Sequence, residues 1–312
     1  MKLKKTNDFL IGTASATGAY LLWGILPVYW KSIICVPSDQ IIAHRVIWCF
    51  LFLVLVLIFA GRFRGFLHEL REIMARPKQL AGLFTASLII SINWYLYIWA
   101  VNNGRIVETS LGYYINPLVS VLLGIVFLQE KLSFWQKVAL LLALVGVLNM
   151  AVSFGAVPWV SLALAVTFGM YGLFKKIVNL DAISGLTIET MIITPFALAY
   201  LIYAYQSGTL IFSFGFSPVT ILTMGAGVVT AAPLLLFAAG VNRLPLYAVG
   251  FLQYFSPTIS LLLGIFLYKE SFTTVHLVSF SLIWAALIVF SLATTRSFIK
   301  PASVSTPKSR SF

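Results

Sequence analysis

The chain has 312 residues, of which 60% are apolar and only 10% are charged, and its formal net charge is +12. A soluble domain needs about a quarter of its residues charged to cover its surface, so this composition excludes an ordinary soluble protein. One bilayer span takes about 20 mostly apolar residues, and ten spans would use about 200 residues and leave the remainder for loops and tails. The composition therefore indicates an all-α polytopic membrane protein.

Apolar runs of spanning length recur along the whole chain, separated by charged residues or by clusters of Pro, Gly and Ser. They predict ten transmembrane helices, at about residues 9–30, 40–60, 80–101, 106–128, 134–152, 157–175, 183–204, 218–240, 246–268 and 272–294. The first run shows no small-residue cleavage pattern, so we expect a span rather than a signal peptide. Residues 295–312 are rich in Ser, Pro and Lys, and we expect a disordered cytoplasmic tail there.

Lysine and arginine residues are distributed unequally between the two sides of these spans. With a cytoplasmic N-terminus, 17 of the 21 basic residues fall on the cytoplasmic side, and only Lys31, Arg105 and Lys269 fall outside. Cytoplasmic loops are enriched in Lys and Arg, and one missed span would reverse the side of every later loop. The distribution predicts ten spans with both termini in the cytoplasm. It also explains the positive charge without a nucleic-acid partner.

The two halves of the chain share a pattern at an offset of 140 residues. In segments 112–130 and 252–270 the Tyr, Pro, Gly and Glu residues fall in register, at positions 114, 117, 124 and 130 and at 254, 257, 264 and 270. This predicts two five-helix repeats, residues 1–152 and 153–294. Because five is odd, the second repeat enters the membrane from the opposite side. Inverted repeats of this kind are typical of secondary transporters.

Several polar and aromatic motifs are more specific than the apolar runs. They are Gly-Ala-Tyr-Leu-Leu-Trp-Gly (18–24), Ala-His-Arg (43–45), Asn-Trp-Tyr-Leu-Tyr-Ile-Trp-Ala-Val-Asn (93–102), Glu-Thr-Ser-Leu-Gly-Tyr-Tyr-Ile-Asn-Pro-Leu (108–118) and Ile-Glu-Thr (188–190). Together they resemble RarD-type proteins of the EamA group in the drug/metabolite transporter superfamily. The resemblance implies a ten-helix inverted-repeat carrier of a bacterial inner membrane. It also implies that spans 1–4 and 6–9 surround a central cavity, with spans 5 and 10 at the periphery.

We therefore expect a secondary transporter, acting as an exporter, of a small organic metabolite or drug-like solute by alternating access. Its partners would be this solute and membrane lipid, and a homodimer is a possible assembly. An uncoupled facilitative carrier or channel for amino-acid-like metabolites is the alternative; an integral-membrane enzyme or a structural subunit fits less well. The sequence has no Gly-x-x-x-x-Gly-Lys-Ser/Thr run, its three histidines do not cluster, and its two cysteines lie at different depths. We expect no cofactor, metal or disulfide, and coupling to protons is a possibility.

Ionisable residues within spans are the first candidates for the site, because each is costly in hydrocarbon and normally faces protein or a wet cavity. They are His44, Arg45, Glu108 and Glu189. Arg45 is expected either to pair with Glu108 near the outer side or to bind an anionic group through its planar fork. Glu189 is expected either to pack against Lys175 or Arg243 or to handle a proton or the solute. His44 is expected to be a hydrogen-bonding neighbour.

Polar residues nearer the middle of the membrane complete the candidate set. Asn116-Pro117 and Ser256-Pro257 predict helix breaks in corresponding positions of the two halves, and such paired breaks indicate a central binding site. The residues predicted for substrate binding or gating are Trp23, His44, Arg45, Asn93, Glu108, Tyr113, Asn116, Glu189, Gln253 and Tyr254. By contrast, Glu130 with Lys131 and Glu270 with Lys269 are expected to form solvated ion pairs at span ends.

The predicted topology can be tested with reporter fusions. We expect a fusion after Thr295 to report the cytoplasm and a fusion within residues 206–217 to report the outside, because an odd number of spans separates them. A reporter active only in the cytoplasm and one active only outside it would measure the side at each point. Equal activity at the two points would contradict the ten-span topology.

Overall fold

The computed structural model describes residues 2–33, 35–102, 105–153, 158–212, 217–267 and 273–299, and this part of the chain is helical apart from turns and short connections. The helices are α1 (Lys2–Ser32), α2 (Ser38–Phe59), α3 (Phe63–Met74), α4 (Pro77–Asn102), α5 (Ile106–Leu128), α6 (Phe134–Ser153), α7 (Trp159–Val178), α8 (Ala182–Gln206), α9 (Pro218–Arg243), α10 (Leu246–Leu252), α11 (Phe255–Phe266) and α12 (Thr274–Ile299). Within the described residues, nine helices are long and apolar enough to cross a membrane, namely all except α3, α10 and α11.

Each of these nine helices coincides with one predicted span. The ends differ most at α1 and α12, which extend beyond the predicted spans to Lys2 and to Ile299. Residues 300–312 of the predicted tail lie outside the described residues, as do Lys269 and Glu270. The chain is thus an all-helical membrane protein, as its composition indicated.

The predicted span 246–268 is interrupted in the structure. Gln253 and Tyr254 form a turn between α10 and α11. Pro257 explains this break, because it has no N–H to offer the carbonyl of Gln253 and stands in the first turn of α11, where proline is tolerated. Pro117 occupies the corresponding position of the first half but lies inside a continuous α5. The expectation of a break in both halves is therefore wrong for the first half.

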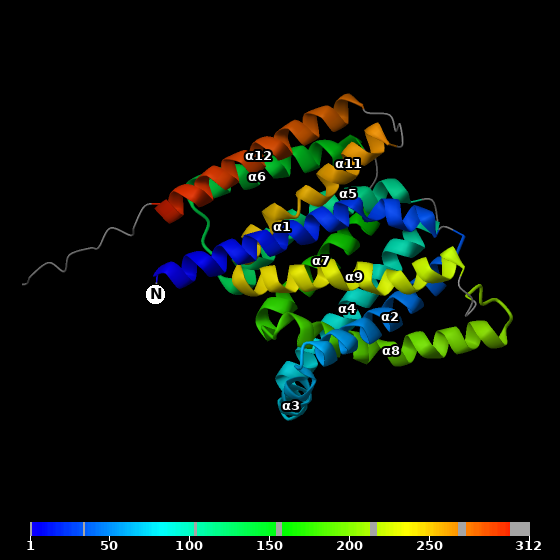
Figure 1. Cartoon of the computed structure of the whole chain (residues 1–312). Coiled ribbons are helices and arrows are strands. Elements are labelled where there is room, and N and C mark those ends of the chain that lie inside the picture. Colours follow the sequence, from blue (N-terminus) through cyan, green and yellow to red (C-terminus); the bar gives the residue numbers. More distant parts are fainter. Residues whose placement is uncertain are drawn as a thin grey trace, which may run out of the picture.

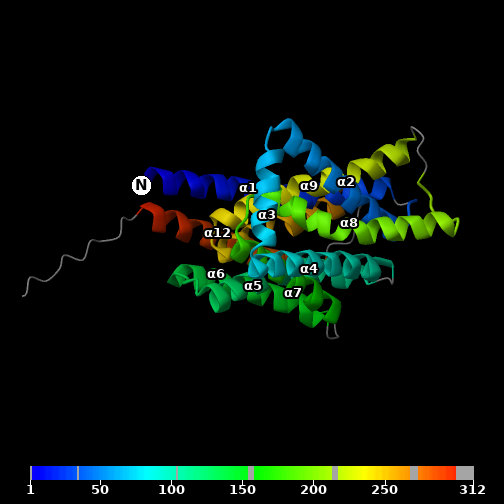
Figure 2. The same cartoon turned by 90° about the horizontal axis from the view of Figure 1, so that it is seen from below.

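The helix α3 lies within residues 61–79, which the sequence analysis treated as a loop. It is strongly amphipathic: Phe66 and Ile73 are buried, whereas Arg64 and Arg71 are exposed. The apolar face packs on residues of α2, α4 and α8, and the helix runs across the direction of the long helices (Figure 2). It was missed because twelve residues with a polar face do not give an apolar run of spanning length.

The long helices pack in pairs that join distant parts of the sequence (Figure 1). α1 packs on α9, α5 on α7, α4 on α7, and α2 on both α8 and α9, while α6 and α12 lie side by side at one edge. Two close approaches depend on glycine. A Cβ atom at Gly227 would overlap the backbone of Trp48 and Cys49, and one at Gly240 would lie 2.9 Å from Cβ of Ala16. Small residues at such crossings let helices approach closely in a membrane.

The crossing of α2 and α9 generates a stability prediction. We expect Gly227→Ala to destabilise the protein by about 1–3 kcal/mol, because the added methyl group must push two backbones apart. Gly65→Ala is the matched control, since a Cβ atom at that position of α3 meets no atom within 4 Å. Thermal unfolding of the purified protein in detergent measures both changes. Equal midpoints for the two variants would show that the crossing is not tightly packed.

Candidate functional site

Arg45 lies on α2, where α1, α4 and α9 bring neutral side chains to it. Its Nε donates a hydrogen bond to Oγ1 of Thr230 at 3.0 Å. The guanidinium carbon lies 4.9 Å from the centre of the Trp30 ring and 4.8 Å from that of Trp94. Such cation–π contacts offset part of the lost hydration of a buried cation. Arg45 is therefore held in place by a hydroxyl group and two aromatic faces.

The predicted ion pair between Arg45 and Glu108 is wrong. Glu108 Oε1 lies 3.0 Å from Nη1 of Arg105, and Oε2 accepts a hydrogen bond from the backbone N–H of Val160 at 3.3 Å. Arg105 precedes Glu108 by three residues, and Val160 is in the first turn of α7, whose free N–H groups attract an anion. These partners hold Glu108 near the N-terminal ends of α5 and α7. Arg45 instead donates its hydrogen bond to Thr230 of α9.

Glu189 on α8 forms a buried ion pair with Lys175 on α7. Their Oε1 and Nζ atoms are 2.8 Å apart, and the two side chains are 3% and 7% exposed. The hydroxyl of Tyr171 donates a hydrogen bond to Oε2 at 3.0 Å. Of the two cations expected near Glu189, Lys175 is confirmed as its partner. Arg243 is exposed and instead donates to the carbonyl of Ala239 in its own helix.

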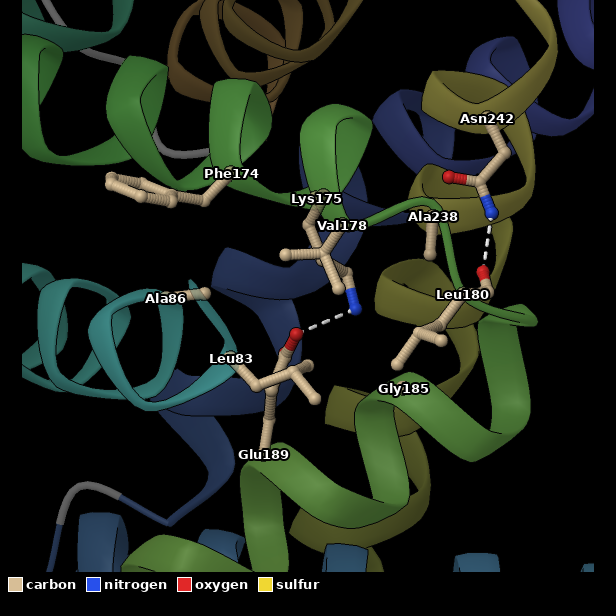
Figure 3. Close-up of a pocket in the computed structure, with 10 residues that line it drawn as sticks. All are labelled: Leu83, Ala86, Phe174, Lys175, Val178, Leu180, Gly185, Glu189, Ala238 and Asn242. Atoms are coloured by element: carbon tan, nitrogen blue, oxygen red, sulfur yellow. Dashed lines mark hydrogen bonds and ion pairs between the residues drawn. The ribbon is translucent and has the colours of Figure 1, made fainter. Parts of the chain in front are cut away.

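Two cavities have Glu189 in their walls. The Lys175 cavity has room for about one water molecule and is bordered by Ala86, Lys175, Glu189 and Asn242 among others. Figure 3 shows Lys175 and Glu189 pointing toward each other in it. The Trp94 cavity is equally small and is bordered by Trp94, Glu189 and mostly apolar residues of α2, α4, α7, α8 and α9. Glu189 thus borders both cavities, whereas Lys175 borders the first of them.

Other predicted residues make contacts between the halves. Asn93 donates hydrogen bonds to the carbonyl of Leu164 at 2.9 Å and to Oγ1 of Thr167 at 2.8 Å, which fixes α4 to α7. The Trp23 ring on α1 packs 5.7 Å from Phe168 and 5.6 Å from Phe237, centre to centre. Trp23 and Asn93 therefore lie where helices of the two halves meet.

His44 is buried and its ring lies 4.4 Å from that of Phe212, centre to centre. Its Nε2 has no hydrogen-bond partner within the part of the chain that the structure describes. The expectation that His44 is a hydrogen-bonding neighbour is not met at this nitrogen.

Three of the predicted polar residues surround the interruption between α10 and α11, which packs on α5 and α1. Asn116, Gln253 and Tyr254 are 3%, 5% and 1% exposed, and Oδ1, Oε1 and the hydroxyl, respectively, have no partner among the described residues. Buried polar atoms are normally hydrogen-bonded, so each such atom suggests a place for water or a ligand. Tyr113, in contrast, is 45% exposed, and its ring lies 6.0 Å from that of Tyr97.

Glu130 has a role that the sequence analysis missed. Its two carboxylate oxygens accept hydrogen bonds from the backbone N–H groups of Leu246 at 2.7 Å and of Tyr247 at 2.9 Å. It therefore caps α10, and the expectation of a solvated ion pair with Lys131 is wrong.

The other side of the same connection is held by Lys176, which contacts the carbonyl groups of Val241 and Leu244 at the end of α9. Pro245, which separates two apolar runs, was the sequence signal for a helix start that needs a cap.

The described residues contain no group of three or more His, Cys, Asp or Glu side chains that could hold a metal ion.

Comparisons with known proteins agree with these features. Residues 10–152 match the EamA-like transporter family. The chain is 49% identical to the uncharacterized transporter YojE of Bacillus subtilis, over 94% of this chain and 96% of YojE. It is 40% identical to protein RarD of Escherichia coli, over 93% of this chain and 96% of RarD. One solved crystal structure, 18% identical, matches 93% of this chain and 99% of its own length with a TM-score of 0.69, which supports the fold.

The buried ion pair generates a prediction about stability. Removing one member leaves the other charge buried and unpaired, which costs about 3–5 kcal/mol. We therefore expect Lys175→Met and Glu189→Leu each to lower the free energy of unfolding strongly, and the double substitution to cost far less than their sum. Denaturant titration in detergent measures all three variants.

Arg62→Gln provides the control. Arg62 and Asp181 also form an ion pair, at 3.1 Å, but the side chains are 48% and 40% exposed. An exposed pair contributes about 0–1 kcal/mol, so this variant is expected to stay near the wild-type value. Additive losses for Lys175→Met and Glu189→Leu would contradict direct coupling.

Proposed function

Because the chain belongs to the EamA transporter family and is a close homologue of the RarD proteins, we propose that it is a secondary carrier that exports a small organic solute by alternating access. The observation that carries this mechanism is the buried Lys175–Glu189 ion pair, whose Glu189 member borders two cavities. A carrier needs such an element, because the solute must pass between two chambers that are not open at the same time.

The positions of the chain ends support a ten-span topology. Nine spans alone would leave the two ends on opposite sides of the membrane. In both views, however, the start of α1 and the end of α12 lie at the same end of the bundle (Figures 1 and 2). α10 and α11 together would supply the tenth crossing, and a broken span of this kind is common in transporters.

The packing of the helices supports an inverted repeat of residues 1–152 and 153–294. In this repeat α1, α2, α4 and α6 correspond to α7, α8, α9 and α12, and α5 corresponds to α10 and α11 together. If each helix is exchanged for its counterpart, the contact of α1 with α9 becomes the contact of α7 with α4. Likewise, the contact of α5 with α7 becomes that of α10 and α11 with α1. All of these contacts are present, and α6 packs on its own counterpart, α12. A pseudo-two-fold axis in the membrane plane would relate such halves.

The distribution of positive charge supports a cytoplasmic position for both ends. The exposed basic face of α3 and the positive ends of the chain belong to the side that receives 17 of the 21 Lys and Arg residues. The relatives come from bacteria, which supports a bacterial inner membrane as the location.

A central solute site would be formed by the polar atoms that have no protein partner in the described residues. These are Oδ1 of Asn116, Oε1 of Gln253 and the hydroxyl of Tyr254, beside the break between α10 and α11. Trp23 and Tyr113 would form its walls, because they lie on α1 and α5, which pack on this break. Asn93 would hold α4 to α7 beside it. In each transport cycle these polar atoms would form hydrogen bonds with the solute and then break them.

Glu189 is the proposed site of proton coupling. Uptake of a proton would remove the charge that holds Lys175, so that the two side chains can separate. Release of the proton would restore the ion pair. Because Glu189 borders both cavities, this change would alter the barrier between them and so couple solute movement to a proton gradient.

A charge-neutral substitution tests this coupling. In proteoliposomes, we expect Glu189→Gln to abolish accumulation driven by a proton gradient while exchange of labelled for unlabelled solute continues, because glutamine keeps the shape but cannot titrate. A panel of labelled metabolites identifies a solute beforehand by counterflow. Glu72→Gln, an exposed position on α3, is the control.

Two results would contradict the proposal. If Glu189→Gln still accumulates solute with unchanged pH dependence, Glu189 is not the coupling site. If the wild-type protein moves solute only down its own gradient, the uncoupled facilitative carrier or channel is the correct description.

A further inference from the structure

We propose that the solute carries a carboxylate and that Arg45 is the residue that binds it. This inference rests on the proposed function, because it names the chemical class that the carrier takes. It starts from one observation: within the described residues, the Arg45 guanidinium has no acidic partner, although it lies inside a membrane span.

Three other helices contribute the nearest neighbours of Arg45. α1 contributes Trp30, α4 contributes Trp94 and α9 contributes Thr230. The side chains of Cys49 on α2, Tyr97 on α4 and Tyr113 on α5 lie close enough to interact electrostatically with the guanidinium. All of these groups are neutral as thiol, phenol, hydroxyl or indole. The surroundings therefore supply aromatic faces and a hydroxyl group, but no negative charge.

Other charged groups in the helical bundle differ from Arg45 in this respect. Glu189 is paired with Lys175, and Glu108 is paired with Arg105. Lys176 contacts two carbonyl groups at the end of α9. These three charges have partners among the described residues, whereas an acidic partner for Arg45 is missing there. A cation inside the bilayer is costly unless an anion or water compensates it.

The geometry leaves the two Nη groups of the guanidinium, which can bind a carboxylate end-on, without a described protein acceptor. Nε is taken by Thr230 at 3.0 Å, and no described residue accepts from Nη1 or Nη2. The N–H groups of an arginine match the two oxygens of a carboxylate in a planar fork. Thr230, Trp30 and Trp94 restrict the orientation of this fork, so less freedom would be lost when an anion binds.

A small cavity whose walls could surround the remainder of the solute adjoins Arg45. Trp94 contacts the guanidinium and also borders the Trp94 cavity, and Val46, the next residue after Arg45, borders it too. Ile90, Leu186, Ile193 and Leu234 make much of this cavity apolar. In a state of the transport cycle in which this cavity is wider, its walls would suit a compact carboxylate with an apolar or aromatic body.

A carboxylate could belong to a simple organic acid or to an amino acid, and four matched probes separate these sources. They are 3-phenylpropionate, L-phenylalanine, 3-phenylpropionamide and phenethylamine, each titrated into the purified full-length protein in detergent. Tryptophan fluorescence and the shift of the unfolding midpoint report binding. We expect at least one of the two acids to bind at least about tenfold more tightly than the amide and the amine, because only an acid gives a charged hydrogen bond to Arg45. The preference between the acids shows whether an ammonium group is tolerated.

Variants assign this preference to Arg45. We expect Arg45→Gln to weaken binding of the preferred acid at least about tenfold while affinity for the amide is unchanged. Arg45→Lys keeps the charge without the planar fork and should give an intermediate affinity. Arg64→Gln removes one positive charge from the exposed face of α3 and should bind like the wild type.

Three outcomes would overturn the assignment: neither acid binds, the amide binds the wild-type protein as tightly as the acid, or Arg45→Gln retains wild-type affinity for the acid. The comparison of acid with amide needs no variant and so does not depend on whether Arg45→Gln folds. Counterflow of a neutral or cationic solute without acid binding would overturn this assignment but leave the proposed transport standing. Binding that depends on Arg45, without counterflow of any solute, would support the assignment and contradict the proposed transport.

Discussion

The cost of placing charge inside a membrane is the constraint on which the rest of this structure depends. Glu189 and Lys175 satisfy it together, and their pairing brings α7 and α8 into direct contact in the interior. Glu108 satisfies it with Arg105 and with a backbone N–H of α7. The ion pairs themselves are local in the sequence, and the hydrogen bond from Val160 to Glu108 is the contact among them that links α7 to α5.

The same constraint makes the polar groups without a described partner informative. Arg45 has aromatic faces and a hydroxyl group but no described anion, and polar atoms of Asn116 and Gln253 are buried without described partners. A purely structural membrane bundle would favour apolar residues at such positions, because each unsatisfied group lowers stability. In a carrier, these positions are explained when a solute or water completes the contacts for part of the cycle. Tight crossings at Gly227 and Gly240 would keep the surrounding helices rigid meanwhile.

The sequence predicted much of the helical arrangement because apolar runs of spanning length and the positions of Lys and Arg depend on the bilayer alone. It also named Lys175 as a partner for Glu189, since depth along two adjacent helices limits the choice. It did not predict the partner of Arg45, because Thr230 and Trp30 lie on helices whose packing against α2 leaves no local pattern. The cap that Glu130 provides to α10 was missed for the same reason. Pro117 and Pro257 show a further limit, since one proline is accommodated within a helix and the other accompanies a break.

Alternating access through the interior beside Glu189 is the central claim, and cysteine accessibility tests it most directly. Ser91, which borders the Trp94 cavity, is replaced by cysteine (Ser91→Cys) in a background without Cys35 and Cys49, and a membrane-impermeant maleimide is applied from each side of the membrane. The account predicts reaction from both sides, with the balance between them shifted by Glu189→Gln. Reaction from the same single side under all conditions, with or without Glu189→Gln, would contradict it.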